Sequence, residues 1–157
     1  MKHFTIYTDG ACSNNPGPGG YGVVITNHKN FVKELSGSYK LTTNNRMELM
    51  AVIKGLEFFK EPSKIIVCSD SKYIIDAVNQ GWLDRWNNNN WYRNGRDIVK
   101  NKDLWKSLLG VLHGHSVKFV WIKGHSGDKL NERCDKLAVS AIHNLDQVID
   151  CGYKRKE

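Results

Sequence analysis

The sequence predicts an α/β fold, a five-stranded mixed sheet flanked by helices, in which three antiparallel strands are followed by parallel strands. Two observations lead to this class. The first 40 residues read as three β-rich runs joined by turns, which is the order of an antiparallel meander. From residue 44 the hydrophobic period becomes helical, and helices then alternate with short apolar runs, as in parallel βαβ units. One sheet satisfies both halves if the two kinds of strand pair within it.

β-branched and aromatic residues justify the three antiparallel strands. They are expected at residues 3–8 (HFTIYT), 20–26 (GYGVVIT) and 31–39 (FVKELSGSY). Residues 27–30 form the turn between the second and the third strand, because asparagine favours turn geometry.

The stretch GPGGYG at residues 17–22 fits the G-x-G-x-x-G pattern of nucleotide-binding loops. A dinucleotide loop opens a helix, because the phosphate lies at the helix N-terminus, whereas strand-like VVIT follows here. A kinase glycine loop lies between strands, but the chain has no H-R-D, D-F-G or V-A-I-K motif and is too short for two lobes. We therefore interpret the prolines and glycines as hairpin turns and expect no nucleotide cofactor.

The second half begins with a helix over residues 44–60, whose apolar residues recur at helical spacing and which Pro62 terminates. The remaining elements are expected as a strand at 64–69, a helix from about 73 to 81, a helix at 103–113, a strand at 117–123 and a helix at 130–145. The run NNNN at residues 87–90 lies in a stretch that we expect to be irregular.

The composition limits the class of protein. With 157 residues, 40% of them hydrophobic, the chain is long enough for one packed core, and we expect a single domain over residues 1–157. No apolar run reaches the roughly 18 residues of a membrane span, and no secretory signal is recognisable. The four cysteines form no C-x-x-C pair, which argues against a zinc site or a disulfide scaffold and favours the cytoplasm. The net charge of +7 suggests a polyanionic partner, although many basic proteins bind none.

Four carboxylates are predicted at the edge of the sheet where open α/β folds bind ligands. Asp9 and Asp70 each end a predicted strand, Glu48 lies in the first turns of the first long helix, and Asp135 lies in the last helix. Ligands of open α/β sheets bind outside the carboxyl ends of parallel strands. Clustered carboxylates raise one another's pKa, and hard divalent cations such as Mg²⁺ or Mn²⁺ remove that cost. Two such ions about 4 Å apart can clamp a phosphodiester during in-line displacement.

Each carboxylate also has a purely structural interpretation. Glu48 fits a capping box with Asn45, and Asp70 fits the N-cap of a helix that starts at Ser71. Asp135 fits a solvated helix position, and Asp9 fits a turn. Spacing alone does not decide between these interpretations.

Longer motifs carry a family resemblance. YTDGAC is followed by NPGPGGYG, TTNNRMELMA, SDSKYI, WIKGHSG and NERCDKLA, in this order. These segments resemble bacterial type 1 ribonuclease H over roughly residues 4–153. The resemblance implies a ribonuclease H-like fold and an endonuclease that hydrolyses the RNA strand of RNA–DNA hybrids with two Mg²⁺ ions, with Mn²⁺ as the alternative. The products would carry 5′-phosphate and 3′-hydroxyl ends.

The resemblance also implies roles for single residues. Asp9, Glu48, Asp70 and Asp135 match the metal-binding carboxylates, and His125 in KGHSG matches a mobile-loop histidine that aids proton transfer or product release. An isolated loop histidine is more often merely solvated, but the glycines beside it permit a loop that moves over the site.

Substrate contacts are implied as well. Recognition of the 2′-hydroxyl distinguishes RNA from DNA, and the matching positions are Cys12 (through its backbone), Asn15, Asn44 and Asn45. Thr43 and Asn101 match a pocket for a phosphate of the DNA strand, and Lys72 takes the place of a glutamine. These asparagines also fit turns and caps, and they can serve in both ways.

Residues 82–103 match the family's basic protrusion, in which Trp82 and two further tryptophans alternate with arginines and lysines. The alternative is that Trp82 and Trp86, four residues apart, anchor a helix to the core. This protrusion is poorer in lysine than is usual, so we expect weaker and more salt-sensitive hybrid binding. Residues 153–157 are expected to form a flexible tail.

Two other functions remain open from the sequence. One is a nuclease of the same broad fold that acts on junctions or transposon ends, which TTNNRMELMA and the NPGPGG hairpin disfavour. The other is a hybrid-binding module without activity, which the presence of all four carboxylates disfavours. We expect a monomer that binds RNA–DNA hybrid and contacts no membrane.

Overall fold

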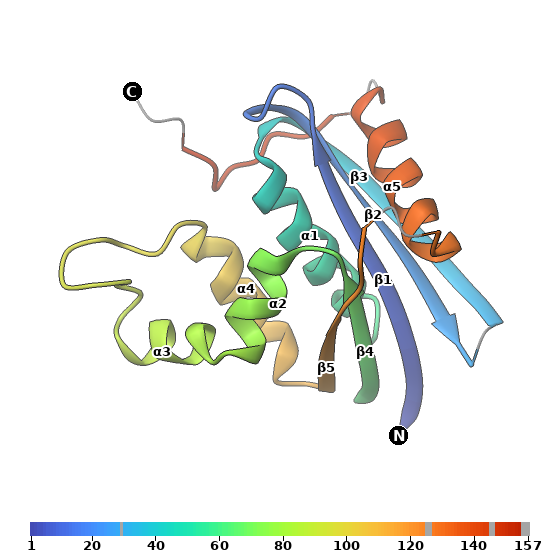
Figure 1. Ribbon diagram of the computed structural model, residues 1–157, viewed down its shortest axis with the longest axis horizontal. Helices are drawn as coiled ribbons and strands as arrows, with labels where there is room; N and C mark the ends of the chain where they lie inside the picture. The colour runs from blue at the N-terminus through green and yellow to red at the C-terminus, as the bar shows by residue number, and fades with distance from the viewer. Residues whose placement is uncertain (29, 125–126, 145–146, 155–157) are drawn as a thin grey trace.

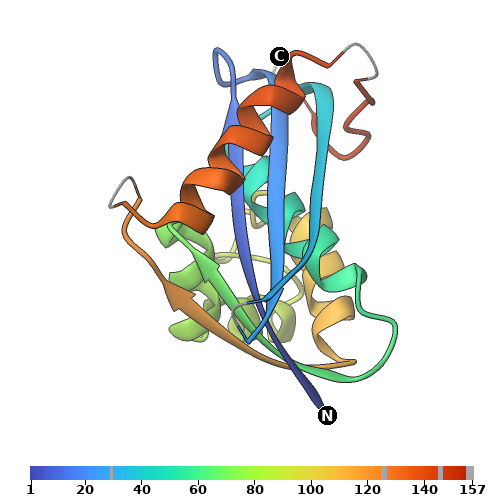
Figure 2. The same cartoon turned by 90° about the vertical axis from the view of Figure 1, so that its right-hand side faces the viewer.

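The computed structural model describes residues 1–28, 30–124, 127–144 and 147–154. Within them, a five-stranded sheet in the order β3-β2-β1-β4-β5 is flanked by five helices (Figures 1 and 2). The strands are β1 (Lys2–Cys12), β2 (Gly17–Asn27), β3 (Asn30–Thr42), β4 (Ser63–Ser69) and β5 (Ser116–Trp121). The helices are α1 (Asn44–Glu57), α2 (Lys72–Asn79), α3 (Trp82–Asn88), α4 (Lys102–Leu112) and α5 (Lys129–Ile142).

The pairing of the strands confirms the predicted fold class. β1 pairs with β2, and β2 with β3, in antiparallel fashion, whereas β4 runs parallel to both β1 and β5. The parallel pairing of β1 with β4 ends at Thr8 and Ser69, so Asp9 of β1 and Asp70 after β4 come to one edge of the sheet. Asp9 neither ends its strand, as we expected, nor forms a turn, because β1 continues to Cys12 in its pairing with β2.

Residues 17–22 all belong to β2, so the glycine-rich stretch is neither a ligand loop nor, as we expected, a turn. The hairpin turn lies at residues 13–16 and includes only Pro16 of the two prolines. A Cβ atom at Gly20 would lie 2.3 Å from the carbonyl oxygen of Ala138, and one at Gly22 would lie 2.3 Å from that of Cys134. The glycines therefore let α5 approach β2 closely, which is a packing reason for the pattern.

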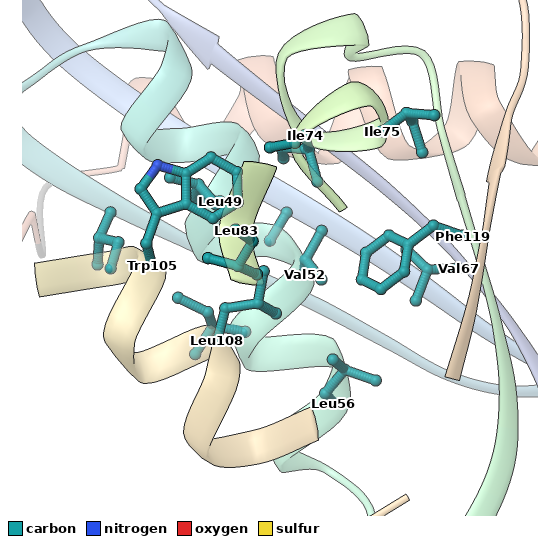
Figure 3. Packing of buried hydrophobic residues seen from close by; sticks show 14 of the residues in the cluster. Leu49, Val52, Leu56, Val67, Ile74, Ile75, Leu83, Trp105, Leu108 and Phe119 are labelled. Atoms are coloured by element: carbon teal, nitrogen blue, oxygen red, sulfur yellow. The ribbon is translucent and has the colours of Figure 1, made fainter. Parts of the chain in front are cut away.

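α1 and α5 lie on opposite faces of the sheet (Figure 2). The larger core lies on the face of α1, where α2, α3 and α4 join it (Figure 3). Trp105 of α4 is fully buried there, and its ring meets that of Trp86 edge to face at 5.5 Å. This packing fixes α4 and α3 relative to the sheet. Among the described residues, no helix is both long and apolar enough to cross a membrane.

Helix α3 corrects the expectation that the run at residues 87–90 is irregular, because Asn87 and Asn88 form its last turn. The helix starts after Gly81, whose φ is +77°, and it buries Leu83 against the core. Tertiary packing therefore stabilises a segment whose asparagines are poor helix formers. α3 and the loop after it extend away from the sheet (Figure 1).

The C-terminal segment, defined here as residues 147–154, runs beside β3. Val148 donates its N–H to the carbonyl of Ser38 at 3.1 Å and accepts from the N–H of Lys40 at 2.8 Å. These bonds bring Asp150 against α1. The last residues of the expected tail, 155–157, lie outside the described residues.

Candidate active site

Three of the four predicted metal-binding carboxylates meet at the carboxyl ends of β1 and β4. One oxygen atom of each of Asp9, Glu48 and Asp70 lies within 4.8 Å of the others. Asp9 and Glu48 are buried, with 6% and 5% of their surface exposed, and Asp70 is half-buried. This arrangement is a compact cluster of oxygen ligands that is open to solvent on one side.

The start of α1 leaves the Glu48 side chain free for the cluster. Thr43 is the N-cap residue, and its hydroxyl oxygen accepts from the Arg46 N–H at 3.3 Å. The interpretation of Asn45 as the cap and Glu48 as its partner is therefore wrong. The Asn45 position fails because the helix begins two residues earlier, at a threonine whose extended backbone suits capping.

Gly10 orients two of the carboxylates. Its N–H donates to Asp9 Oδ1 at 2.9 Å and to Glu48 Oε1 at 3.0 Å. A Cβ atom at this position would lie 2.4 Å from the backbone nitrogen of Glu48, so β1 and α1 touch here. Sequence reasoning missed Gly10, although a glycine directly after an aspartate in a strand was the available signal.

Contacts with Trp121 and with the chain at Gly124 position Asp70, which does not cap α2. Ser71 is the N-cap residue of α2, so the interpretation of Asp70 as the cap is wrong. The Asp70 carbonyl accepts from Trp121 Nε1 at 3.2 Å. A Cβ atom at Gly124 would lie 2.7 Å from Asp70 Oδ2, so the chain after β5 also approaches this carboxylate. His125 itself lies outside the described residues.

The electrostatics of the cluster favour a cation. Burial is the main cause that raises the pKa of Glu48 well above its usual range, and the charges of Asp9 and Asp70 add to it. Burial, with the charges of Asp70 and Asp135, raises the pKa of Asp9 to about 6, against the opposing effect of its hydrogen bond with Glu48. Among the described residues, Glu48 Oε2 is buried without a hydrogen-bond partner. A hard divalent cation fits this donor set, because it would neutralise the repulsion and occupy the orphaned oxygen.

Asp135 approaches the cluster from the other side of the sheet. It is half-buried on α5, whose first turn is capped by the Asp128 carboxylate, an acceptor from the N–H groups of Leu130 and Asn131. Asp135 is not part of the three-residue oxygen cluster, but its charge contributes to the raised pKa of Asp9.

The residues expected to read the 2′-hydroxyl lie around the start of α1. Asn15, in the β1–β2 turn, accepts from the Asn44 N–H at 3.0 Å, so its side chain also has a structural task. Cys12 ends β1, with its Sγ 3.4 Å from the Thr42 carbonyl oxygen, and Asn45 is exposed beside Asn44.

The two residues of the expected phosphate pocket precede different helices, and one residue, Arg46, bridges them through its backbone and its side chain. Thr43 precedes α1 and Asn101 precedes α4. Arg46 bonds to both, because its backbone N–H donates to Thr43 and its Nη1 donates to Asn101 Oδ1 at 3.3 Å. Asn101 Nδ2 donates in turn to the Tyr73 hydroxyl at 3.1 Å. Sequence reasoning missed Arg46 and Tyr73, because their partners are remote in the chain.

The protrusion presents aromatic rings as well as cations. Trp82 and Trp86 are half-buried and pack against the core, which agrees with the interpretation that they anchor a helix. The same two rings also line a hollow of about 770 Å³ whose other walls include Tyr73, Arg85, Tyr92 and Arg93. Lys72, the first residue of α2, does not line this hollow; it is exposed, with its Nζ 4.1 Å from the centre of a Trp121 ring.

Comparisons with known proteins agree on one family. The sequence model of the RNase H family matches residues 1–143. Ribonuclease H of Trichodesmium erythraeum is 59% identical over 150 residues, which cover 96% of this chain and 95% of the relative. Ribonuclease HI of Synechocystis is 50% identical, with 95% and 93% covered.

The solved structures that superpose on this chain include type 1 RNases H. LC9-RNase H1, a type 1 RNase H with the type 2 active-site motif, superposes with a TM-score of 0.81 at 30% identity, covering 90% of this chain and 72% of its own. LC11-RNase H1, solved in complex with an RNA/DNA hybrid, gives a TM-score of 0.70 at 29% identity, with 88% and 96% covered.

Proposed function

Because the chain belongs to the ribonuclease H family, we propose that it hydrolyses the RNA strand of RNA–DNA hybrids at the carboxylate cluster. The observation that carries the proposal is the meeting of Asp9, Glu48 and Asp70 within 4.8 Å, with one Glu48 oxygen left without a partner among the described residues. The hybrid as substrate is supported by the family and by the complex of LC11-RNase H1 with an RNA/DNA hybrid.

Asp9, Glu48, Asp70 and Asp135 would hold two divalent cations, with Mg²⁺ as the physiological ion and Mn²⁺ as the alternative. When bound, the ions supply a water of lowered pKa for in-line attack and charge stabilisation for the leaving 3′ oxygen. The Gly10 N–H orients Asp9 and Glu48, and the contacts of Trp121 and Gly124 hold Asp70 in place. We assign to His125 the transfer of protons that the metal-bound carboxylates cannot transfer, or a role in product release. The products would carry 5′-phosphate and 3′-hydroxyl ends.

The minor groove of the hybrid would lie against Cys12, Asn15, Asn44 and Asn45, which provide amide and backbone groups for a 2′-hydroxyl. Thr43 and Asn101 would bind a phosphate of the DNA strand. Lys72 and Trp82 would contact the backbone beyond the cleavage site.

The protein is proposed to act as a monomer in the cytoplasm. The proposal of the cytoplasm is supported by the four free cysteines, since free thiols are typical of proteins in a reducing compartment. Light scattering during gel filtration would test the monomer, and a stable dimer would contradict it.

The decisive experiment compares one labelled sequence as RNA–DNA hybrid, RNA duplex and DNA duplex, each with Mg²⁺, with Mn²⁺ and with EDTA. We expect metal-dependent cutting of the hybrid's RNA strand alone. Asp9→Asn should abolish cutting and retain hybrid binding. Cutting of DNA junctions or plain duplexes would favour the rival nuclease, and binding without cutting under either metal would favour the inactive binding module.

A further inference from the structure

We propose that Arg46 and Tyr73 are positioning residues that assemble Thr43 and Asn101 into one phosphate-binding pocket, and that Asp150 of the C-terminal segment completes this assembly. The inference rests on the proposed function, because the pocket would bind the DNA strand of a hybrid. It adds that the grip on DNA depends on a residue 104 positions along the chain from Arg46.

Arg46 has no donor to spare for a ligand. Its side chain is 2% exposed, and a guanidinium carries five N–H donors. Its five side-chain hydrogen bonds match them, with one bond from Nε to Asp150, two from Nη1 to Asn101 and Asp103, and two from Nη2 to Asp103 and Asp150. Arg46 therefore acts by holding other residues and not by touching phosphate.

The hydrogen bonds of Thr43 and Asn101 leave each side chain one hydrogen atom that it can donate to an anion. Arg46 donates to an oxygen of both Thr43 and Asn101, which occupies acceptor sites and leaves the Thr43 hydroxyl hydrogen available. Tyr73 accepts one of the two Nδ2 hydrogens of Asn101, and the other remains. The Thr43 hydroxyl and the Asn101 amide thus each keep one hydrogen atom to donate. They suit a phosphate oxygen, which only accepts hydrogen bonds.

Tyr73 orients the Asn101 amide by binding its nitrogen, whereas Arg46 binds its oxygen. Its hydroxyl oxygen also accepts from Trp105 Nε1 at 3.1 Å, and Trp105 is fully buried. The hydroxyl is thus tied to the core through Trp105. A phenylalanine at position 73 would keep the ring packing but remove the acceptor of both the Asn101 amide and Trp105 Nε1.

Asp150 anchors Arg46 from the C-terminal segment. Its carboxylate accepts from Arg46 Nε at 2.7 Å and Nη2 at 3.0 Å, and from the Thr42 hydroxyl at 2.7 Å. Asp103 binds the other edge of the guanidinium, with bonds of 2.6 and 2.8 Å. A Cβ atom at Gly152 would lie 1.8 Å from Asp103 Oδ2, so the segment fits closely over the ion pairs. Displacement of this segment would loosen the Arg46 side chain and, through it, Asn101, while the backbone bond from Arg46 to Thr43 would remain as the cap of α1.

The test uses hybrids in which a single phosphate of the DNA strand is replaced by a neutral methylphosphonate, scanned along that strand. Affinities are measured in EDTA, which prevents cutting, for the wild type, Tyr73→Phe and Asp150→Asn. In the wild type, we expect one position at which the neutral group weakens binding. Both variants should bind the unmodified hybrid about three- to tenfold more weakly, which is the effect of a partly lost charge-assisted hydrogen bond. In both variants, the methylphosphonate at the sensitive position should cause much less of the loss of affinity (the methylphosphonate penalty) that it causes in the wild type.

Kinetics provide a second readout. KM should rise by about the same three- to tenfold factor while kcat stays within about twofold, because the pocket binds ground state and transition state alike. Glu34→Gln serves as the control, since it removes an exposed ion pair with Arg133 and should leave KM and the penalty unchanged. If Asp150→Asn does not fold, as judged by circular dichroism, Tyr73→Phe decides.

This inference would be overturned if the folded variants showed the same methylphosphonate penalty as the wild type. The proposed function would stand in that case, provided that the hybrid is cut. No sensitive phosphate in a wild type that cuts hybrid would also overturn it. A wild type that neither binds nor cuts hybrid would overturn the proposed function and the inference together.

Discussion

The Gly10 N–H lies 3.0 Å from Glu48 Oε1 and joins residues that are 38 positions apart in the chain. The same N–H donates to Asp9 Oδ1, so one backbone group sets the relative position of two carboxylates. The site is therefore built on the contact between β1 and α1, and not on a loop.

Gly10→Ala should disable the enzyme, because its Cβ atom would lie 2.4 Å from the Glu48 nitrogen and would push α1 away. A displacement of about 1 Å at a reacting centre costs on the order of 100-fold, and we expect kcat to fall by about this factor. Steady-state cleavage of hybrid measures it. Gly110→Ala is the control, because a Cβ atom there meets nothing within 4 Å, and its activity should be normal. Normal activity of Gly10→Ala would contradict the role given to this contact.

The stabilisation by Mg²⁺ should grow with pH. The folded-state pKa values of Asp9 (about 6) and Glu48 lie above those of the unfolded chain. The metal-free protein therefore has their full contribution to stability below about pH 4 and loses it as pH rises through 6 and beyond. A bound cation needs the ionised carboxylates and compensates this loss. The Tm difference between Mg²⁺ and EDTA should be larger at pH 8 than at pH 5, and equal differences would contradict the cluster as the metal site.

Asp9→Asn should stabilise the metal-free protein at pH 8 while it abolishes cutting. Removal of this charge relieves the repulsion that contributes to the raised pKa of Glu48, and we expect a gain of about 1 kcal/mol in the free energy of unfolding. Urea denaturation in EDTA measures the gain. Asp97→Asn, which removes a carboxylate of an exposed ion pair with Arg93, should change stability by less than about 0.5 kcal/mol. A destabilised Asp9→Asn protein would show that hydrogen bonding outweighs charge here.

Asp150→Asn should cost far more stability than Glu34→Gln. It removes one of two carboxylates that neutralise a buried guanidinium, and we expect a loss of about 3 kcal/mol. The Glu34 pair is solvent-exposed, so its loss should cost less than about 1 kcal/mol. Urea midpoints at equal m-values provide the comparison. Similar losses in the two variants would show that the C-terminal segment is not strongly anchored.

Arg85→Gln should make hybrid binding less sensitive to salt. Arg85 lines the hollow of the protrusion, and each lost phosphate contact lowers the slope of log affinity against log salt by about 0.7–0.9. Tyr92→Leu, on the same hollow, should weaken binding without a change of slope, because a ring contributes stacking and not charge. Equal slopes for the wild type and Arg85→Gln would remove Arg85 from the interface. The expectation of steeper salt dependence than in a lysine-rich relative stays a prediction that the same plots can test.

The convergence of Asp9, Glu48 and Asp70 could be foreseen, because strand ends and helix starts are local features and the fold class brings them to one edge. The choice of cap could not, since TTNN offers several capping residues in a row and only the tertiary position of α1 selects Thr43. Helix α3 was not predicted, because its asparagines disfavour a helix locally and the burial of Leu83 outweighs them.

The support of the phosphate pocket was invisible in the sequence for a different reason. Arg46 and Asp150 are 104 positions apart, and no periodicity or motif connects them. An arginine that follows two asparagines at the start of a helix is interpreted as a solvated residue until the carboxylates that bind it are located. Long-range ion pairs of this kind are seen only in three dimensions.

The pairing of Arg46 with Asp150 has a consequence for the order in which a newly made chain acquires its abilities. During translation, β1 and α1 emerge early, and residues 147–154 leave the ribosome after every strand of the sheet. A nascent chain can therefore bring its carboxylates together before the partner of Arg46 has been made. Metal affinity would therefore come before a firm hold on the DNA strand, because Asp150 is made after all the carboxylates of the cluster.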